Sequence, residues 1–389
     1  MKLVMKKIKR TVNDMNQPLL TATIIFFIFG LLNIVTASSR EAISLDVTLY
    51  HYFFKQLQML LIGLIATIFI LNFDTERYYK IAFTGFVLIV AILLYLLISG
   101  EANRGALNWI NLFGFTFQPS EFAKPIIIVC LALLFEKNYN KLRNKNSKHN
   151  EIIGKIIVAG CLIPAIIFLQ KDFGTMFIIL CIFGVMFFAS PILRIEKIKT
   201  IGLLTGVAFV AGLIFFSING FILSKAQLQR LDFLNPCKKY EHGGYQICNG
   251  FIAINDGGLL GIGIGKSRQK YSYIPEPHTD SVFPIIAEEY GYLKVIPIFI
   301  AYIFILYRIL DLASKANTLR GRYMCLGVAT YIFMHVLVNL GGIFGVMPLT
   351  GVPLPFLSYG GSFTISLICS LALVQRVHIE TRNQKIIIK

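Results

Sequence analysis

Long apolar runs repeat along the whole chain, and they constrain its fold more than any other feature. Runs of about 18 residues or more can cross the hydrocarbon core of a bilayer as helices. The mean hydropathy of +0.69 and the charged fraction of 15% agree with this interpretation, because about a quarter of the residues are charged in a soluble globular protein. We therefore predict an all-α polytopic membrane protein with a single membrane domain over residues 1–389.

About ten transmembrane spans can be placed on these runs, and an even number puts both chain termini on one side of the membrane. The loop between the seventh and eighth spans, about 219–283, is the longest, and its glycines, tyrosines and recurring apolar residues predict ordered structure. Loops of such length are usually functional or disordered. The expected spans are 18–37, 55–72, 79–99, 121–136, 153–170, 173–190, 200–218, 284–307, 323–346 and 357–375.

The net charge of +17 is distributed unevenly across the expected membrane. Most of the 37 Lys and Arg fall on the side of the two termini, including those of the basic N-terminal segment 1–17. Positive residues favour the cytoplasmic side, so both termini are predicted to be cytoplasmic and the long loop extracytoplasmic. The basic excess then sets topology and favours anionic lipid headgroups, not nucleic acid. The run 18–37 is longer than a signal-peptide core, so we interpret it as an anchor.

Two of the seven cysteines, Cys237 and Cys248, fall in the long outer loop. A disulfide is permitted in that compartment, and the sequence leaves their pairing open. The other five lie in expected spans, where cysteine is usually a small apolar packing residue. The chain has no CxxC pair and no recognisable metal-ligand spacing.

Charged residues at membrane depth cost roughly 2.5–3.5 kcal/mol each on insertion scales, so they need a partner or a function. Glu121 and Lys124 are three residues apart and would share one helix face. They form either a structural ion pair or a cation directed at an anionic substrate. Asp172, in the short outer turn QKDFG, is either a turn residue or helix cap, or a member of a site.

The segment PEPHTDSVFPIIAEE, residues 275–289, concentrates four carboxylates at the edge of an apolar run. If its helix began early, Glu276, Asp280 and Glu288 would lie on one face. Asp280 would then stand at the helix mouth near the outer membrane boundary, where it suits a general base. The alternative is a carboxylate that satisfies helix amides. We interpret His278 as an orienting hydrogen-bond partner in preference to a second base.

The segment GVMPLTGVPLPFLSYGG, residues 345–361, contains three prolines and four glycines, which forbid a continuous helix. Broken backbone at membrane depth is tolerated where it is buried or lines a cavity, so we expect this segment to wall a cavity near the outer leaflet. An enzyme acting on a lipid-linked substrate and a transporter both fit these features. Transporter sites lie near the midplane, whereas these polar groups cluster outside, which favours the enzyme.

Several motifs follow one another along nearly the whole chain: QPSEFAK, KDFGT, GYQICNGFIAINDGGLLGIGIGKSRQKYSYIPEPHTD, AEEYG and MPLTGVPLPFLSYGGS. Together they resemble the FtsW/RodA/SpoVE (SEDS) family. SRQKYSYIPEPHTD is more similar to the FtsW and SpoVE branch than to the RodA branch. Asn108 stands where the family usually has an arginine, which removes a cation.

This resemblance implies a peptidoglycan glycosyltransferase that polymerises lipid II at the outer face of the bacterial cytoplasmic membrane, for cell division or cell shape. It also implies a class B penicillin-binding protein as the crosslinking partner. Asp280 matches the catalytic aspartate of the family's HTD motif and would be the general base. The matched or neighbouring candidates for substrate binding are Glu121, Lys124, Asp172, Glu276, His278, Thr279, Arg104 and Ser358.

The leaving undecaprenyl diphosphate needs positive charge as it departs. Lys124, with Arg104 or a divalent cation (Mg2+ or Mn2+), would supply it, and the cavity behind the SYGG sequence that contains Ser358 would hold the lipid tail. Two other functions are weighed against this one. A lipid II flippase predicts polar residues deep in the spans, whose middles are mostly apolar, and a non-catalytic scaffold that recruits a transpeptidase would tolerate loss of Asp280.

Overall fold

The computed structural model describes residues 10–99, 101–103, 106–112, 115–144, 149–219, 233, 235–238, 244–271 and 274–387. Arg104, which was expected beside the diphosphate, lies outside the described residues. So do the first nine residues of the basic N-terminal segment and much of the predicted loop 219–283.

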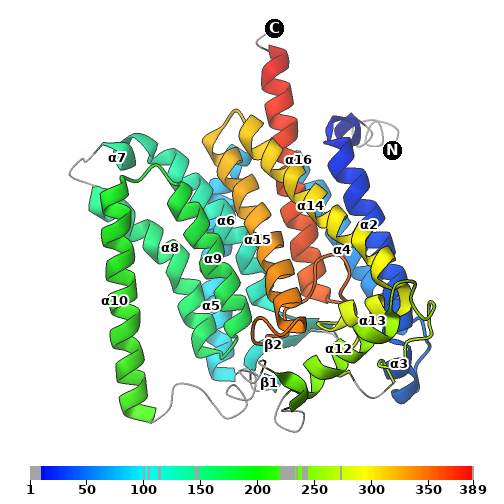
Figure 1. Ribbon diagram of the computed structural model, residues 1–389. Coiled ribbons are helices and arrows are strands. Elements are labelled where there is room, and N and C mark those ends of the chain that lie inside the picture. Colours follow the sequence, from blue (N-terminus) through cyan, green and yellow to red (C-terminus); the bar gives the residue numbers. More distant parts are fainter. Residues whose placement is uncertain are drawn as a thin grey trace.

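A bundle of long helices forms the body of the molecule (Figure 1). The long helices of the described chain coincide, within a few residues at most ends, with the ten expected spans, except at the eighth. They are α2 (Gln17–Ala37), α4 (His51–Asn72), α5 (Tyr78–Ser99), α6 (Pro119–Lys137), α8 (His149–Leu169), α9 (Phe173–Ala189), α10 (Arg194–Asn219), α14 (Tyr292–Lys315), α15 (Leu319–Ile343) and α16 (Gly361–Ile387).

Seven helices of the described chain are long and apolar enough to cross a membrane: α2, α4, α5, α8, α14, α15 and α16. Helix α9 is apolar but shorter, at 17 residues. Helix α6 includes the charged residues Glu121, Lys124, Glu136 and Lys137. These helices make the chain an integral membrane protein. The count of ten spans stays a prediction.

The helices divide into a buried centre and an apolar periphery. Helices α15 and α16 are the most buried spans, whereas α4 and α5 expose large apolar side chains such as Leu61, Phe69 and Ile98. Contiguous apolar surface of this kind is unfavourable in water. Lipid tails are as apolar as Leu, so a bilayer would solvate these faces without such a cost.

Short elements gather at the end of the bundle opposite the two termini (Figure 1). A small antiparallel sheet lies there between α5 and α6, with Ile110 paired to Phe117 and Leu112 to Phe115. The expected all-α class is therefore incomplete: the fold is mostly helical with one sheet. The short elements at this end are α3 (Ser39–Ser44), β1 (Glu101–Asn103), β2 (Ala106–Leu112), β3 (Phe115–Phe117), α12 (Tyr245–Gly257) and α13 (Val282–Tyr290). On the terminal side lie η1 (Thr75–Arg77) and α7 (Tyr139–Arg143).

Helix α12 is attached to the preceding segment by a disulfide between Cys237 and Cys248. The sequence left this pairing open, and the structure contains it. The five other cysteines are free.

The expected eighth span, 284–307, is wrong as a continuous helix. Helix α13 ends at Tyr290, Gly291 adopts a φ of 78°, and α14 begins at Tyr292. Gly291 packs against Gly261, because a Cβ on Gly291 would lie 2.2 Å from the Gly261 nitrogen. Backbone hydrogen bonds from Tyr292 N–H to the Gly258 carbonyl (2.9 Å) and from Ile262 N–H to the Glu288 carbonyl (3.0 Å) fix this contact. The glycine-rich segment therefore permits close backbone approach, as its sequence predicts.

We expect Gly291→Ala to destabilise the protein by about 1–3 kcal/mol or more, because it combines a left-handed backbone with a backbone clash. Thermal unfolding of the purified protein in detergent measures the effect. Gly184→Ala on α9 is the matched control, since a Cβ there meets no atom within 4 Å and alanine favours helix. A Gly291→Ala variant that melts with the wild type would contradict this account of the α13–α14 break.

Candidate functional site

Asp280 lies in a turn before α13, not on the first turn of a long span. Asp280 is 7% exposed. Its Oδ2 faces Gly351, at 3.6 Å from where a Cβ on that glycine would lie. Because α13 begins at Val282, Glu276 and Asp280 precede the helix. The predicted common helix face of Glu276, Asp280 and Glu288 is therefore wrong.

Asn339 of α15 holds Asp280 in place. Its side-chain amide donates to the Asp280 carbonyl at 2.7 Å and to the Val352 carbonyl at 2.8 Å. One amide thus joins the turn that contains His278, Thr279 and Asp280 (the HTD turn) to the non-helical segment 345–360 after α15 (the broken segment). Asn339 is only 3% exposed. Backbone carbonyl groups buried at this depth need a hydrogen-bond donor, and Asn339 supplies one to each of these two. Sequence reasoning missed Asn339, although a polar side chain within the apolar run of α15 was a signal.

Thr279 brings two of the expected site carboxylates together. Its hydroxyl lies 3.0 Å from Glu276 Oε2 and 3.4 Å from Asp280 Oδ1. Glu276 itself adopts a φ of 50°, which is uncommon for a residue with a side chain. The structure therefore brings Glu276, Thr279 and Asp280 together through a turn, whereas the sequence predicted Glu276, Asp280 and Glu288 on one helix face.

His278 is buried between aromatic rings, with centroids 4.5 Å from Tyr52 and 5.4 Å from Tyr359. Its carbonyl accepts a hydrogen bond from Tyr359 N–H at 2.8 Å, and its Nδ1 lies 3.2 Å from Glu41 Oε2 on α3. Burial raises the pKa of Tyr359 to about 12, and the Glu41 carboxylate adds to the shift, so this phenol stays neutral at physiological pH. The role of His278 as an orienting partner stays a prediction.

Glu121 and Lys124 form an ion pair inside the bundle on α6. Lys124 Nζ lies 2.6 Å from Glu121 Oε1, and Lys124 has no exposed surface. The same amine lies 3.0 Å from His335 Nε2 on α15. Since an ammonium only donates, His335 Nε2 accepts, and its Nδ1–H donates to the Pro353 carbonyl at 3.2 Å. The ion pair thereby reaches the broken segment through His335, which sequence reasoning also missed.

Asp172 caps helix α9, which is one of the two interpretations that the sequence allows. Its Oδ1 accepts from Thr175 N–H at 3.1 Å. Its Oδ2 accepts from the Asn108 amide at 2.8 Å and the Gln118 amide at 3.1 Å. Asn108, at the position of the family's usual arginine, thus connects β2 to the N-cap of α9 by a hydrogen bond from its uncharged amide to the Asp172 carboxylate.

Ser358 lies in the broken segment, where its hydroxyl accepts from Leu354 N–H at 2.8 Å. The next residue, Tyr359, donates to the His278 carbonyl, so this segment contacts the HTD turn directly. The segment between α15 and α16 is not helical, as predicted.

Glu288 and Glu289, the last two acids of the 275–289 segment, bind neighbouring backbone and side chains. Glu288 accepts from the Ser267 hydroxyl and from Arg268 N–H at 2.8 Å. Glu289 pairs with Lys270 at 3.0 Å, and both side chains are almost fully buried. These contacts hold the 265–271 segment on α13. The four carboxylates therefore serve two purposes, and only Glu276 and Asp280 belong to the candidate site.

The long apolar helices define an integral membrane protein. Its candidate site is the polar turn around Asp280, at the end of the bundle opposite the termini. A family model described as "Cell cycle protein" for FtsW, RodA and SpoVE matches residues 16–383. The chain belongs to the FtsW/RodA/SpoVE family.

Curated relatives cover most of the chain. A Bacillus subtilis protein named "Probable peptidoglycan glycosyltransferase FtsW" is 29% identical over 375 residues, which span 95% of this chain and 92% of that protein. The Bacillus subtilis "Stage V sporulation protein E" is 31% identical over 366 residues, 92% of this chain and 95% of the relative.

Two solved structures share the fold. One, described as "Structural coordination of polymerization and crosslinking by a peptidoglycan synthase complex", has a TM-score of 0.71 at 24% identity and covers 94% of this chain and 97% of that chain. The Thermus thermophilus rod shape determining protein RodA has a TM-score of 0.66 at 24% identity, over 94% and 96% of the two chains.

We expect Lys124→Met to destabilise the protein by about 3–5 kcal/mol, because it leaves the Glu121 carboxylate buried without its cation. The double variant Glu121→Gln/Lys124→Met should regain most of that loss. Thermal unfolding in detergent tests both. The control is Lys155→Met, whose Glu151 partner also lies at 2.6 Å but with side chains 62% and 58% exposed; it should unfold like the wild type. If Lys124→Met also unfolds like the wild type, the buried ion pair does not contribute to the stability of the protein.

Proposed function

We propose that this chain is a peptidoglycan glycosyltransferase of the FtsW-like branch that polymerises lipid II into β-1,4 glycan strands. The observation that carries the proposal is the buried turn in which Asn339 holds Asp280 beside Glu276 and Thr279. The names of the curated relatives, peptidoglycan glycosyltransferase FtsW among them, support the same reaction.

In the proposed reaction, the 4-hydroxyl oxygen of the acceptor sugar attacks C1 of the donor. The bond from C1 to the diphosphate breaks, and inversion converts the α-diphosphate into a β-1,4 link. Asp280 takes the hydroxyl proton as general base. Its carboxylate suits this role because its backbone is fixed by Asn339 and its Oδ1 lies near the Thr279 hydroxyl.

The leaving diphosphate needs compensation of its negative charge. Lys124 stays the candidate cation on α6; because Glu121 and His335 enclose it and Glu121 compensates its charge, we propose that it acts on the diphosphate only when this pair opens. Arg104, in the first outer loop, stays a candidate for that contact. Ser358 and the broken segment around it stay candidates for contact with the lipid tail.

The proposed location is the bacterial cytoplasmic membrane, with both termini cytoplasmic and the site extracytoplasmic. The two termini at one end of the bundle and the polar site at the other agree with this orientation (Figure 1). A class B penicillin-binding protein is the proposed partner. Its support is the fold shared with a chain of a peptidoglycan synthase complex described by polymerization and crosslinking.

Asp280→Asn is expected to reduce glycan polymer formed from labelled lipid II by about 100-fold or more, because the base is lost while the side chain keeps its shape. The purified protein is assayed with its penicillin-binding partner, and Asp256→Asn, an exposed acid on α12, is the control. Equal polymer from wild type and Asp280→Asn would refute the assignment of Asp280. Absence of polymer even from wild type would favour a flippase or a scaffold.

Asn339→Leu should lower the kcat of polymerisation by about 10- to 100-fold with little change in KM, because it releases the Asp280 backbone and not the substrate. Asn339→Asp should be equally impaired, since it keeps the shape but loses both donor protons. Steady-state kinetics on folded variants separate these parameters. A rise in KM alone would place Asn339 in substrate binding instead.

A further inference from the structure

Two carboxylates and one imidazole from distant parts of the chain meet beside the HTD turn. Glu41 comes from α3, and Glu276 and His278 come from the turn, yet their candidate ligand atoms all lie within 4.8 Å of one another. Ligand atoms about 2.0–2.3 Å from a common ion lie up to roughly 4.5 Å apart. The separations of the three ligand atoms are therefore close to those of atoms that share one ion.

We propose that Glu41, Glu276 and His278 form a binding site for a divalent cation of the first transition row. One imidazole nitrogen with two carboxylate oxygens suits Mn2+ or Zn2+ better than Ca2+, which prefers oxygen ligands alone. The family resemblance suggests a divalent ion only in general terms, whereas these residues give it a position.

The groups around the three ligands are arranged as outer partners of a metal site. The Tyr52 hydroxyl donates to Glu41 Oε1 at 3.0 Å, and the Thr279 hydroxyl donates to Glu276 Oε2 at 3.0 Å. Each carboxylate is thus oriented by a donor, as ligating carboxylates usually are. The rings of Tyr52 and Tyr359 fix the plane of the His278 imidazole.

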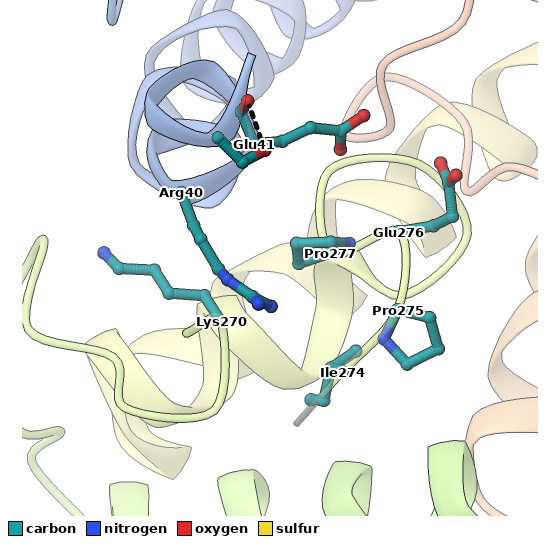
Figure 2. Close-up of a pocket in the computed structure, with 8 residues that line it drawn as sticks. Arg40, Glu41, Lys270, Ile274, Pro275, Glu276 and Pro277 are labelled. Atoms are coloured by element: carbon teal, nitrogen blue, oxygen red, sulfur yellow. Dashed lines mark hydrogen bonds between the residues drawn. The ribbon is translucent and has the colours of Figure 1, made fainter. Parts of the chain in front are cut away.

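The charge balance of this corner also favours a cation. Glu41, Glu276 and Asp280 converge around one turn, and like charges so close are unfavourable. Lys270, which lines the adjoining pocket, is paired with Glu289. Figure 2 shows the Glu41 and Glu276 carboxylates pointing to the same side, away from the Arg40 guanidinium. A divalent ion would reduce the repulsion between these carboxylates.

An ion can enter this cluster from the surface. Glu41 and Glu276 line a pocket of about 220 Å³ together with Arg40, Ser44, Lys270 and Pro277. The Glu41 side chain is 33% exposed, whereas that of His278 is 3% exposed. The site is thus closed on the imidazole side and open at one carboxylate, which leaves coordination positions for water or a phosphate oxygen. The Thr279 hydroxyl lies between Glu276 and Asp280, so the ion would lie next to the proposed base.

Mn2+ is the probe, added to the full-length protein in detergent without anionic lipid. We expect one bound Mn2+ per chain by electron paramagnetic resonance, with a nitrogen-14 coupling from the imidazole in pulsed spectra of the wild type. Glu41→Gln and Glu276→Gln should weaken binding by roughly tenfold or more, and Tyr52→Phe by about tenfold through loss of an outer partner. His278→Phe should abolish the nitrogen coupling, whereas Asp256→Asn should bind like the wild type.

No bound Mn2+ in the folded wild type at millimolar concentration would overturn the proposal. Binding without the nitrogen coupling, or binding unchanged in Glu41→Gln, would overturn it as well, because the ion would then lie elsewhere. The wild-type spectrum alone decides the first two outcomes, so they do not depend on whether a variant folds. The measurement uses no lipid II, and failure of metal binding is therefore distinguishable from failure of the proposed glycosyltransfer.

Discussion

The amide of Asn339 is the contact on which the candidate site depends. Two stretches of irregular backbone, the turn before α13 and the segment after α15, meet at one end of a membrane bundle. Irregular backbone at that depth is stable only where the protein satisfies its polar groups. Asn339 donates to one carbonyl of each stretch, Asp280 and Val352. The side chain thereby fixes the register between the acid-bearing turn and the segment that faces it.

Charged groups inside the bundle follow the same requirement for a partner. Lys124 contacts Glu121 and His335, and His335 contacts the Pro353 carbonyl one residue beyond the Asn339 contact. His335 and Asn339 are four residues apart on α15 and so lie on one face of that helix. This face connects the buried ion pair of α6 to the outer end of the molecule, which makes α15 the element that positions the site.

The helix bundle was largely predictable from the sequence, because long apolar runs have few alternatives to membrane helices. The grouping of Glu276, Thr279 and Asp280 followed from their proximity in the chain. The break at Gly291 was not predictable by pattern alone, because it depends on contact with Gly261, 30 residues earlier in the chain. The small sheet depends on strand pairing across the first outer loop. Glu41 gave no signal at all, since its contact with His278 joins α3 to the turn before α13, and only the fold brings these two elements together.

The most direct test of Asp280 as the general base is a structure of the protein with lipid II bound as acceptor. We expect the acceptor 4-hydroxyl within hydrogen-bond reach of the Asp280 carboxylate, about 2.6–3.2 Å, with the sugar on the outer side of the Asn339 contact. An acceptor hydroxyl bound away from Asp280, or a lipid II headgroup held at the terminal end of the bundle, would contradict it.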